Sequence, residues 1–220
     1  MWQCPGVEST VRLFVPGFAA PAHLYRPGLS REWTALEAPG FRGTDGRLEG
    51  RLGRLPDEIA RRPGRIVLAG HSMGAALSVL AAAELPHRIE RLLLLSPAGL
   101  PLEKPVRASV ADLARQVARG LYPLGALAHP LASAARAPRS MLRLAREVRT
   151  LDLSAEMKRV RTAGVPVSVI GCTTDTLVTP AHCRRAAELL GGRYRELVAA
   201  GGHVWMLADA ARLAAELSTG

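Results

Sequence analysis

The chain has 220 residues, 48% of them hydrophobic, and a formal net charge of +10; this length suits one domain that buries about 70% of its surface. A balance this basic raises the question of a nucleic-acid partner. Aromatic residues make up only 4% of the chain, however, and no nucleic-acid module is recognisable. The cations are almost all arginine, with Lys104 and Lys158 as the exceptions. We therefore expect a solvated basic surface and no nucleic-acid partner.

Apolar runs and helical patterns alternate along the chain, which is typical of a parallel α/β sheet. The expected strands, in chain order, are residues 10–15, 33–38, 66–68, 89–100 with a loop at their end, 165–171 and 194–200. The expected helices are residues 55–62, 73–85, 180–190 and 205–218.

Between residues 99 and 163 the strand patterns vanish, and helical runs are broken by Pro105, Pro123, Pro130 and Pro138. This segment holds twelve Lys and Arg residues against five Asp and Glu residues, so it carries +7 of the net charge of +10. We expect it to be a helical insertion, 99–163, in a core made of residues 1–98 and 164–220.

Four arginines of the insertion, Arg136, Arg139, Arg143 and Arg146, are spaced three and four residues apart. This spacing predicts that they lie along one face of a helix. Such a face could attract an anionic substrate, an acyl carrier or a membrane surface. Charge runs are more often solvated surface, and the sequence leaves both interpretations open.

The stretch RIVLAGHSMGAALSVLAAAELP, residues 65–86, places Ser72 between Gly70 and Gly74. A buried-strand pattern precedes the serine, and an alanine- and leucine-rich helix pattern, ended by Pro86, follows it. A sharp turn from strand to helix would strain the backbone of Ser72, lift its hydroxyl above the sheet edge and require small residues on either side. The pattern predicts a nucleophilic serine; the alternative is an ordinary strand-to-helix turn.

A serine hydroxyl needs a base to take its proton and an acid to orient that base. In a parallel sheet such groups gather at the carboxyl ends of the strands. Asp175 follows the fifth expected strand and His203 follows the sixth, where Gly201 and Gly202 would let the backbone bring the imidazole to the serine. The chain order Ser72, Asp175, His203 is the one expected for this kind of nucleophile.

Each partner also has a simpler interpretation. Asp175 could cap the helix that starts at Pro180, and His203 could be a surface or core histidine. Their occurrence in order on successive loops favours the catalytic interpretation. Among the other histidines, His71 is held next to the serine and should point towards the sheet, and His182 lies too near the acid.

Acyl transfer also needs two donors for the oxyanion. The helix start leaves the amide of Met73 without a carbonyl partner. The second donor should come from the loop after the first strand, where Gly17 allows a sharp turn that would aim the amide of Phe18 at the serine. The alternative is that Pro16 and Gly17 form an ordinary turn.

The N-terminal residues MWQCPGVEST contain neither a basic n-region nor an apolar h-region, and no apolar run approaches about 20 residues. We therefore expect no signal peptide and no integral membrane segment. Three scattered cysteines, Cys4, Cys172 and Cys183, suit a reducing cytoplasm and lack the spacing of a metal site.

With these motifs the chain resembles the α/β-hydrolase family. The similarity rests on PGF near the start, GHSMG, GCTTDTLVTP and GGHVWML, and it covers essentially the whole chain. The resemblance implies Ser72 as nucleophile, Asp175 as acid, His203 as base, and the Phe18 and Met73 amides as oxyanion hole. It also implies no cofactor, and a helical cap over the site formed by the insertion.

The chain departs from the family pattern in two respects. Members usually carry histidine before the glycine of the oxyanion loop, where this chain has Pro16. The chain also begins at what the family counts as its third strand. We therefore expect the α/β-hydrolase fold with a minimal, mostly parallel sheet of about six strands and helices on both faces.

A serine nucleophile argues against the dehalogenases and epoxide hydrolases of the family, which use aspartate. The leading hypothesis is a cytoplasmic serine hydrolase, carboxylesterase- or lipase-like, that cleaves a small-molecule ester or thioester. The alternatives are an acyltransferase with the same triad and a non-catalytic binding module. The acyl group and the oligomeric state cannot be derived, since specificity depends on the cap and loops.

Overall fold

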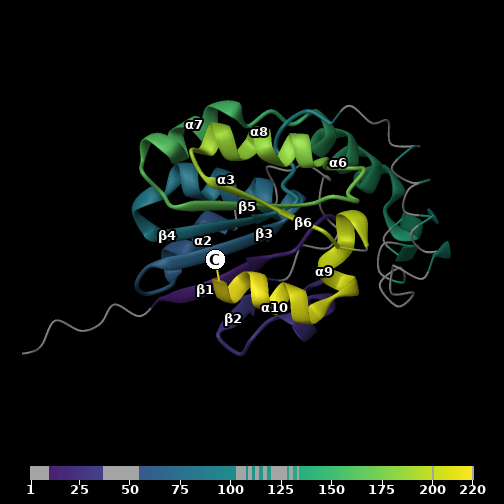
Figure 1. The fold of residues 1–220 in the computed structure, drawn as a ribbon, viewed down its shortest axis with the longest axis horizontal. Coiled ribbons are helices and arrows are strands. Elements are labelled where there is room, and N and C mark those ends of the chain that lie inside the picture. The colour runs from purple at the N-terminus through teal and green to yellow at the C-terminus, as the bar shows by residue number, and fades with distance from the viewer. Residues whose placement is uncertain are drawn as a thin grey trace, which may run out of the picture.

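In this computed structural model, residues 10–36, 55–102, 134–199 and 201–219 are described, together with isolated positions between 108 and 132. The strands are β1 (Val11–Val15), β2 (Trp33–Ala35), β3 (Ile66–His71), β4 (Ile89–Leu95), β5 (Val167–Cys172) and β6 (Arg193–Leu197). They form one parallel sheet in the order β2-β1-β3-β4-β5-β6 (Figure 1). The predicted α/β class and the sheet of about six strands are confirmed.

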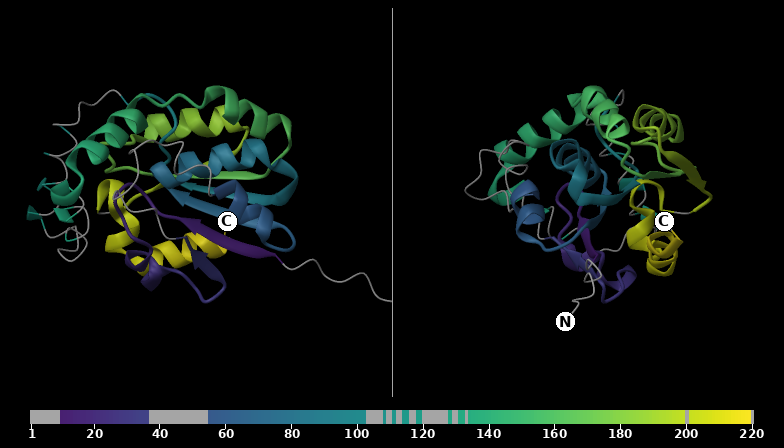
Figure 2. Two further views of the ribbon diagram at one scale, coloured as in Figure 1. Left: turned by 180° about the vertical axis from the view of Figure 1, so that it is seen from behind. Right: turned by 90° about the vertical axis from the view of Figure 1, so that its left-hand side faces the viewer.

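Helices cover both faces of this sheet, as expected. The helices are α2 (Leu55–Arg61), α3 (Met73–Glu84), α6 (Pro138–Thr150), α7 (Ser154–Thr162), α8 (Pro180–Leu190), α9 (Trp205–Ala208) and α10 (Ala210–Thr219). The short 3-10 helices are η1 (Ala22–Leu24), η2 (Arg26–Gly28), η3 (Pro86–Arg88) and η4 (Gly202–Val204). Figures 1 and 2 show α3, α7 and α8 on one side of the sheet and α10 on the other.

The strands contribute alternate residues to two cores. Leu13 and Val15 of β1 belong to the core beneath α3, α7 and α8. Phe14, between them, packs with Trp205 and Leu213 of the opposite layer. Because both faces of the sheet are buried, the central strands are apolar at consecutive positions and do not alternate with polar residues.

Helix α3 lies at the centre of the molecule, packed on β3, β4 and α7. It is buried almost all round, and its many alanines permit this because small side chains let neighbouring elements approach closely. The helix ends at Glu84, Leu85 leaves the helical conformation, and Pro86 begins η3. The predicted end at Pro86 is therefore confirmed to within two residues.

The predicted helix over residues 205–218 is wrong in one respect, because it is divided into α9 and α10 at Asp209. The backbone of Asp209 has φ −132° and ψ 85°, which is not helical. Its carboxylate accepts the amide hydrogen of Arg212 at 2.8 Å and so caps the start of α10. Strand β2 ends at Ala35, and residues 37–38 of the predicted strand lie outside the described residues.

The part of segment 99–163 that is described contains α6, α7 and no strand. Arg139, Arg143 and Arg146 are exposed on α6, while Leu144 and Val148 are buried beneath it, so these three arginines share the outer side as expected. The prediction is wrong for Arg136, which is exposed but lies before α6, because the backbone of Ala137 has φ −145° and ψ 59° and breaks the helix. Helix α7 packs against α3 and α8. Much of 103–133 lies outside the described residues, and the cap stays a prediction.

Cys172 and Cys183 are free and buried, while Cys4 lies outside the described residues. Throughout the described ranges, every helix is too short or too polar to cross a bilayer.

Candidate active site

Ser72 follows β3 directly and stands at the N-cap of α3, with φ 53° and ψ −116°. This is a backbone conformation that non-glycine residues rarely adopt. Two hydrogen bonds secure it: the Ser72 amide donates to the carbonyl of Leu95 at 3.0 Å, and its carbonyl accepts from the amide of Ala98 at 3.1 Å. Both partners lie at or beyond the carboxyl end of β4, so the neighbouring strand holds the strained turn in place.

Close packing explains the glycines on either side of the serine. A Cβ atom on Gly74 would lie 2.1 Å from the carbonyl oxygen of Val15 and 2.4 Å from that of Pro16. A Cβ atom on Gly70 would lie 2.6 Å from the carbonyl oxygen of Gly74. The first turn of α3 therefore lies directly against the end of β1 and the loop that follows it.

The predicted acid, Asp175, lies in the loop after β5 and is almost fully buried, at 2% exposure. Its Oδ1 accepts the amides of Leu177 and Val178, each at 2.9 Å, and its Oδ2 faces His203. It is not the cap of α8, because Thr179 has that role. Burial by itself raises the pKa of Asp175, but the facing imidazole and the two amides outweigh burial and hold the pKa below its ordinary value.

The predicted base, His203, lies in η4 after β6 and connects the acid to the serine. Its Nδ1 is 2.9 Å from Oδ2 of Asp175, and its Nε2 is 2.9 Å from Oγ of Ser72. A carboxylate can only accept, so Nδ1–H donates to it and Nε2 is left to accept from the serine hydroxyl. The structure thus brings together all three residues predicted from the sequence, in one continuous hydrogen-bonded chain.

The loops that carry the acid and the base are tied to each other. The hydroxyl of Thr174, next to Asp175, donates to the carbonyl of Ala199 at 2.8 Å. Glycine is needed at position 201, where φ is 101° as the chain turns into η4. The turn that delivers His203 is therefore anchored to the acid's own loop.

The two predicted oxyanion donors lie on either side of the close contact between α3 and β1. Met73 is the first residue of α3, where amides have no helical carbonyl partner. Phe18 follows β1, and β1 pairs with β3 so that Val15 is opposite Gly70. Both loops consequently start from the same edge of the sheet.

No group of three or more His, Cys, Asp or Glu side chains in the described ranges could hold a metal ion.

Comparison with known proteins shows the family. The model of the α/β-hydrolase family matches residues 13–216. The chain belongs to the α/β-hydrolase family. No match was found among curated protein sequences.

Solved structures with this α/β-hydrolase fold resemble the chain at low sequence identity. A lipase-esterase related protein from Clostridium acetobutylicum ATCC 824 has TM-score 0.72 and 17% identity, over 96% of this chain and 93% of its own. The enol-lactonase from Burkholderia xenovorans LB400 has TM-score 0.64 and 24% identity, over 97% and 90% of the two chains. A protein described as a putative lipase from Acinetobacter baumannii AYE has TM-score 0.69 and 16% identity, over 96% and 83%. At these identities the likeness shows the fold alone.

Backbone strain in this α/β-hydrolase is concentrated around the site. Among the described residues, the non-glycine positions with positive φ are Ala19, Ser72 and Ser96. They follow β1, β3 and β4, which are neighbouring strands, at their carboxyl ends. Strain of this kind persists where the surrounding structure enforces it, and it is common at functional sites.

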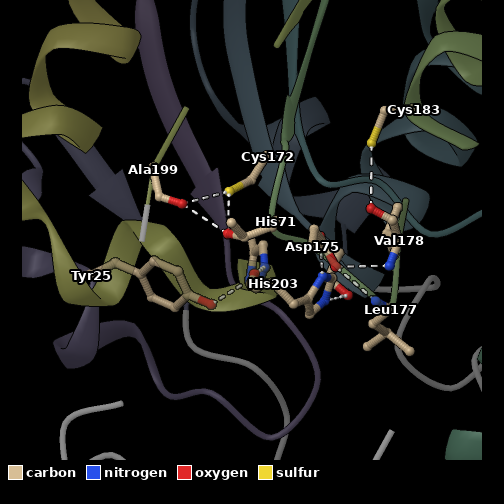
Figure 3. Close-up of polar contacts among 11 residues, drawn as sticks. Tyr25, His71, Cys172, Asp175, Leu177, Val178, Cys183, Ala199 and His203 are labelled. Carbon is tan, nitrogen blue, oxygen red and sulfur yellow. Dashed lines mark hydrogen bonds and ion pairs between the residues drawn. The ribbon is translucent and has the colours of Figure 1, made fainter. Parts of the chain in front are cut away.

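Sequence reasoning missed two features beside the site, Tyr25 and the full role of His71. The expectation that His71 points towards the sheet agrees with its burial, at 3% exposure. Its Nδ1 lies 2.8 Å from the hydroxyl of Tyr25 and its Nε2 lies 3.0 Å from the carbonyl oxygen of His203. Figure 3 shows His71 between Tyr25 and His203. Tyr25 follows a 3-10 turn in a segment that carries no motif, so no sequence signal indicates it.

We expect the buried His71 to make the protein less stable in mild acid. Burial, reinforced by the neighbouring His203, lowers the pKa of His71 from 6.5 to about 3. Below pH 6.5 the unfolded chain therefore binds a proton at this residue that the folded chain does not, so acid favours unfolding. The loss is about 1.4 kcal/mol per pH unit, or about 2 kcal/mol at pH 5.

Chemical denaturation at pH 7 and pH 5 measures this effect. In His71→Gln the difference in unfolding free energy between the two pH values should shrink by about 2 kcal/mol relative to wild type. His87, exposed in η3, offers a matched control, since His87→Gln should keep the wild-type difference. Equal acid sensitivity in His71→Gln and wild type would show that His71 is not buried in its neutral form.

Proposed function

We propose that this α/β-hydrolase is a serine hydrolase that cleaves a carboxylic ester or thioester of a small molecule through an acyl-enzyme at Ser72. The observation that carries the proposal is the continuous chain from Asp175 through His203 to Oγ of Ser72, with both bonds at 2.9 Å. A nucleophile, a base and an orienting acid within hydrogen-bond reach form the arrangement that nucleophilic acyl transfer requires.

In the proposed acylation, Nε2 of His203 takes the hydroxyl proton as Oγ of Ser72 attacks the substrate carbonyl carbon. The negative charge that develops on the carbonyl oxygen is stabilised by the amides of Phe18 and Met73. The Asp175 carboxylate stabilises the imidazolium, which then delivers its proton to the leaving alcohol or thiol. The C–O or C–S bond breaks, and the acyl group stays on the serine.

In the proposed deacylation, His203 takes a proton from a water molecule that attacks the ester carbonyl of the acyl-enzyme. The imidazolium returns this proton to Oγ of Ser72, and a carboxylic acid leaves. The low pKa of Asp175 keeps its carboxylate ionised throughout, so it stabilises the imidazolium in both half-reactions without itself taking the proton.

The substrate class follows from the same proposal. Solved structures described as a lipase-esterase related protein, an enol-lactonase and a putative lipase support ester chemistry. Residues 99–163 would cap the site, and the protein would act in the cytoplasm without a cofactor. The first alternative is an acyltransferase, in which an alcohol or thiol replaces water in deacylation at the same residues. The second is a non-catalytic binding module that keeps the pocket.

A fluorophosphonate probe is expected to label Ser72, because the probe reacts with a serine whose hydroxyl proton is taken by a neighbouring imidazole. Intact-mass and peptide mass spectrometry locate the modified residue. Ser72→Ala should abolish labelling. Ser78 serves as a matched control, because its hydroxyl donates to the carbonyl of Gly74. Ser78→Ala should therefore be labelled like wild type.

Labelling of another serine, or no labelling of folded protein, would contradict the serine-hydrolase proposal and favour the binding module. An ester and thioester panel, with mass detection of the acyl-enzyme, then defines the acyl group. The same panel with added alcohols or thiols separates hydrolase from acyltransferase, because only the latter yields the transferred ester as its main product.

A further inference from the structure

A second hydrogen-bonded chain runs through the protein beneath the candidate triad. The amide of Gly17 donates to the hydroxyl oxygen of Tyr25 at 3.2 Å, and the Tyr25 hydroxyl lies 2.8 Å from Nδ1 of His71. At the other side of the imidazole, Nε2 of His71 lies 3.0 Å from the carbonyl oxygen of His203. The chain therefore starts in the loop after β1 and ends on the backbone of the proposed base.

Chemistry determines the direction of every bond in this chain. The His203 carbonyl can only accept, so Nε2–H of His71 must donate to it. In a neutral imidazole Nδ1 is then the acceptor, and the Tyr25 hydroxyl must donate to it. The tyrosine oxygen in turn accepts the Gly17 amide. All three groups are satisfied at once, which is what a buried polar chain needs in order to be stabilising.

This hydrogen-bonded chain joins the three segments whose relative positions matter for the proposed reaction. Gly17 precedes Phe18, whose amide is a proposed oxyanion donor; His71 precedes the proposed nucleophile; and the third segment carries His203. Tyr25 is fully buried and His71 is 3% exposed. The loop approaches so closely that a Cβ atom on Gly17 would lie 2.6 Å from Nδ1 of His71.

We propose that Tyr25 and His71 are positioning residues that hold the oxyanion loop and the backbone of His203 in place around Ser72. This inference rests on the proposed function. Neither side chain needs to touch the substrate. Their effect would act through geometry, since displacing a reacting group by about 1 Å can cost about 100-fold in rate.

A purely structural role of Tyr25 would predict a different result. Tyr25 stacks at a tilt on Phe14, with ring centroids 4.8 Å apart, so it also contributes to the core between the sheet and α10. Tyr25→Phe keeps that ring and removes only the hydroxyl, which isolates the hydrogen bonds. If Tyr25 served packing alone, this variant would leave the chemistry of the folded enzyme unchanged.

The first experiment measures steady-state hydrolysis of a short-chain p-nitrophenyl ester and the rate of fluorophosphonate labelling at saturating probe. Tyr25→Phe should lower kcat and the labelling rate by about 10-fold, with KM within about twofold, because the hydroxyl's hydrogen bonds to the Gly17 amide and to His71 are both lost and the groups that they position can shift. Tyr194→Phe is the matched control, since it removes a tyrosine hydroxyl that bonds Glu196. It should keep wild-type kcat.

A second pair of variants tests His71 with side chains of similar size. His71→Leu cannot donate to the His203 carbonyl and should lose about 100-fold in kcat, whereas the amide of His71→Gln can donate and should recover to within about 10-fold of wild type. Adding Tyr25→Phe to His71→Leu should cost less than the loss in Tyr25→Phe alone, since the bond between Tyr25 and His71 is already absent and only the bond to the Gly17 amide remains to be lost.

The outcomes separate this inference from the proposed function. If Ser72→Ala abolishes activity but folded Tyr25→Phe keeps wild-type kcat, or His71→Leu equals His71→Gln, the positioning role is overturned while the hydrolase stands. If Ser72→Ala remains active, the proposed function itself fails. Thermal melts restrict the comparison to folded variants, and Tyr25→Phe, which retains the aromatic packing, tests the inference should His71→Leu fail to fold.

Discussion

Replacing His203 by alanine is expected to lower the turnover of an ester by at least about 1,000-fold while the fold survives. The imidazole is the only group that joins Oγ of Ser72 to the acid among the described residues, so its loss leaves the hydroxyl without a base. Its side chain is 13% exposed but belongs to neither apolar core, so the fold should tolerate its removal. Steady-state kinetics on protein with a wild-type melting profile measure the loss.

Asp175→Asn should cost a similar factor for a different reason. An amide can donate to Nδ1, which would place the imidazole proton on Nε2 and point it at the serine. His23→Ala and Asp152→Asn, at exposed positions of η1 and of the turn before α7, are the matched controls and should retain wild-type turnover. Near-normal turnover in Asp175→Asn would mean that another residue orients the base.

Gly74→Ala is expected to destabilise the protein by about 3 kcal/mol or more, at the upper end of overpacking effects. The new Cβ would lie 2.1 Å from the carbonyl oxygen of Val15. That oxygen belongs to a strand paired on both sides, so it cannot move aside cheaply. Chemical denaturation measures the change, and any folded fraction should also label more slowly at Ser72, because the turn carrying the serine must shift.

Gly164 provides the comparison, because it has φ +71° but a Cβ atom added there would meet nothing within 4 Å. Gly164→Ala therefore carries only the conformational penalty, about 1 kcal/mol. If Gly74→Ala were no worse than Gly164→Ala, the close approach of α3 to β1 would be contradicted.

Local patterns were sufficient for most of the fold. The strands β1, β3, β4, β5 and β6 and the helices α2, α3 and α8 begin and end within a few residues of the predicted limits, apart from the loop that was included with β4. Apart from β6, which is mostly exposed, those elements bury apolar side chains at regular positions, and this regularity is what makes them readable in the sequence. The same patterns could not foresee the break at Asp209, where a carboxylate ends one helix and caps the next.

For the candidate site, the sequence by itself determined which residues were candidates for nucleophile, acid and base. The glycines on either side of Ser72 indicate a sharp turn between a strand and a helix. Asp175 and His203 each follow an apolar run that predicts a strand. Parallel strands place their carboxyl ends at one edge, so the three could be expected to meet there. Whether Asp175 capped a helix or faced the histidine was open, since both uses begin with a carboxylate after a strand.

Only the tertiary structure decided that question and revealed the chain beneath the site. The cap of α8 is Thr179, which leaves Asp175 for His203. Tyr25 and His71 are 46 residues apart, and His71 meets a backbone carbonyl 132 residues away. Hydrogen bonds of this kind depend on how strands and loops pack in space. Because every residue has a backbone carbonyl, no local sequence pattern can predict which carbonyl will accept from His71.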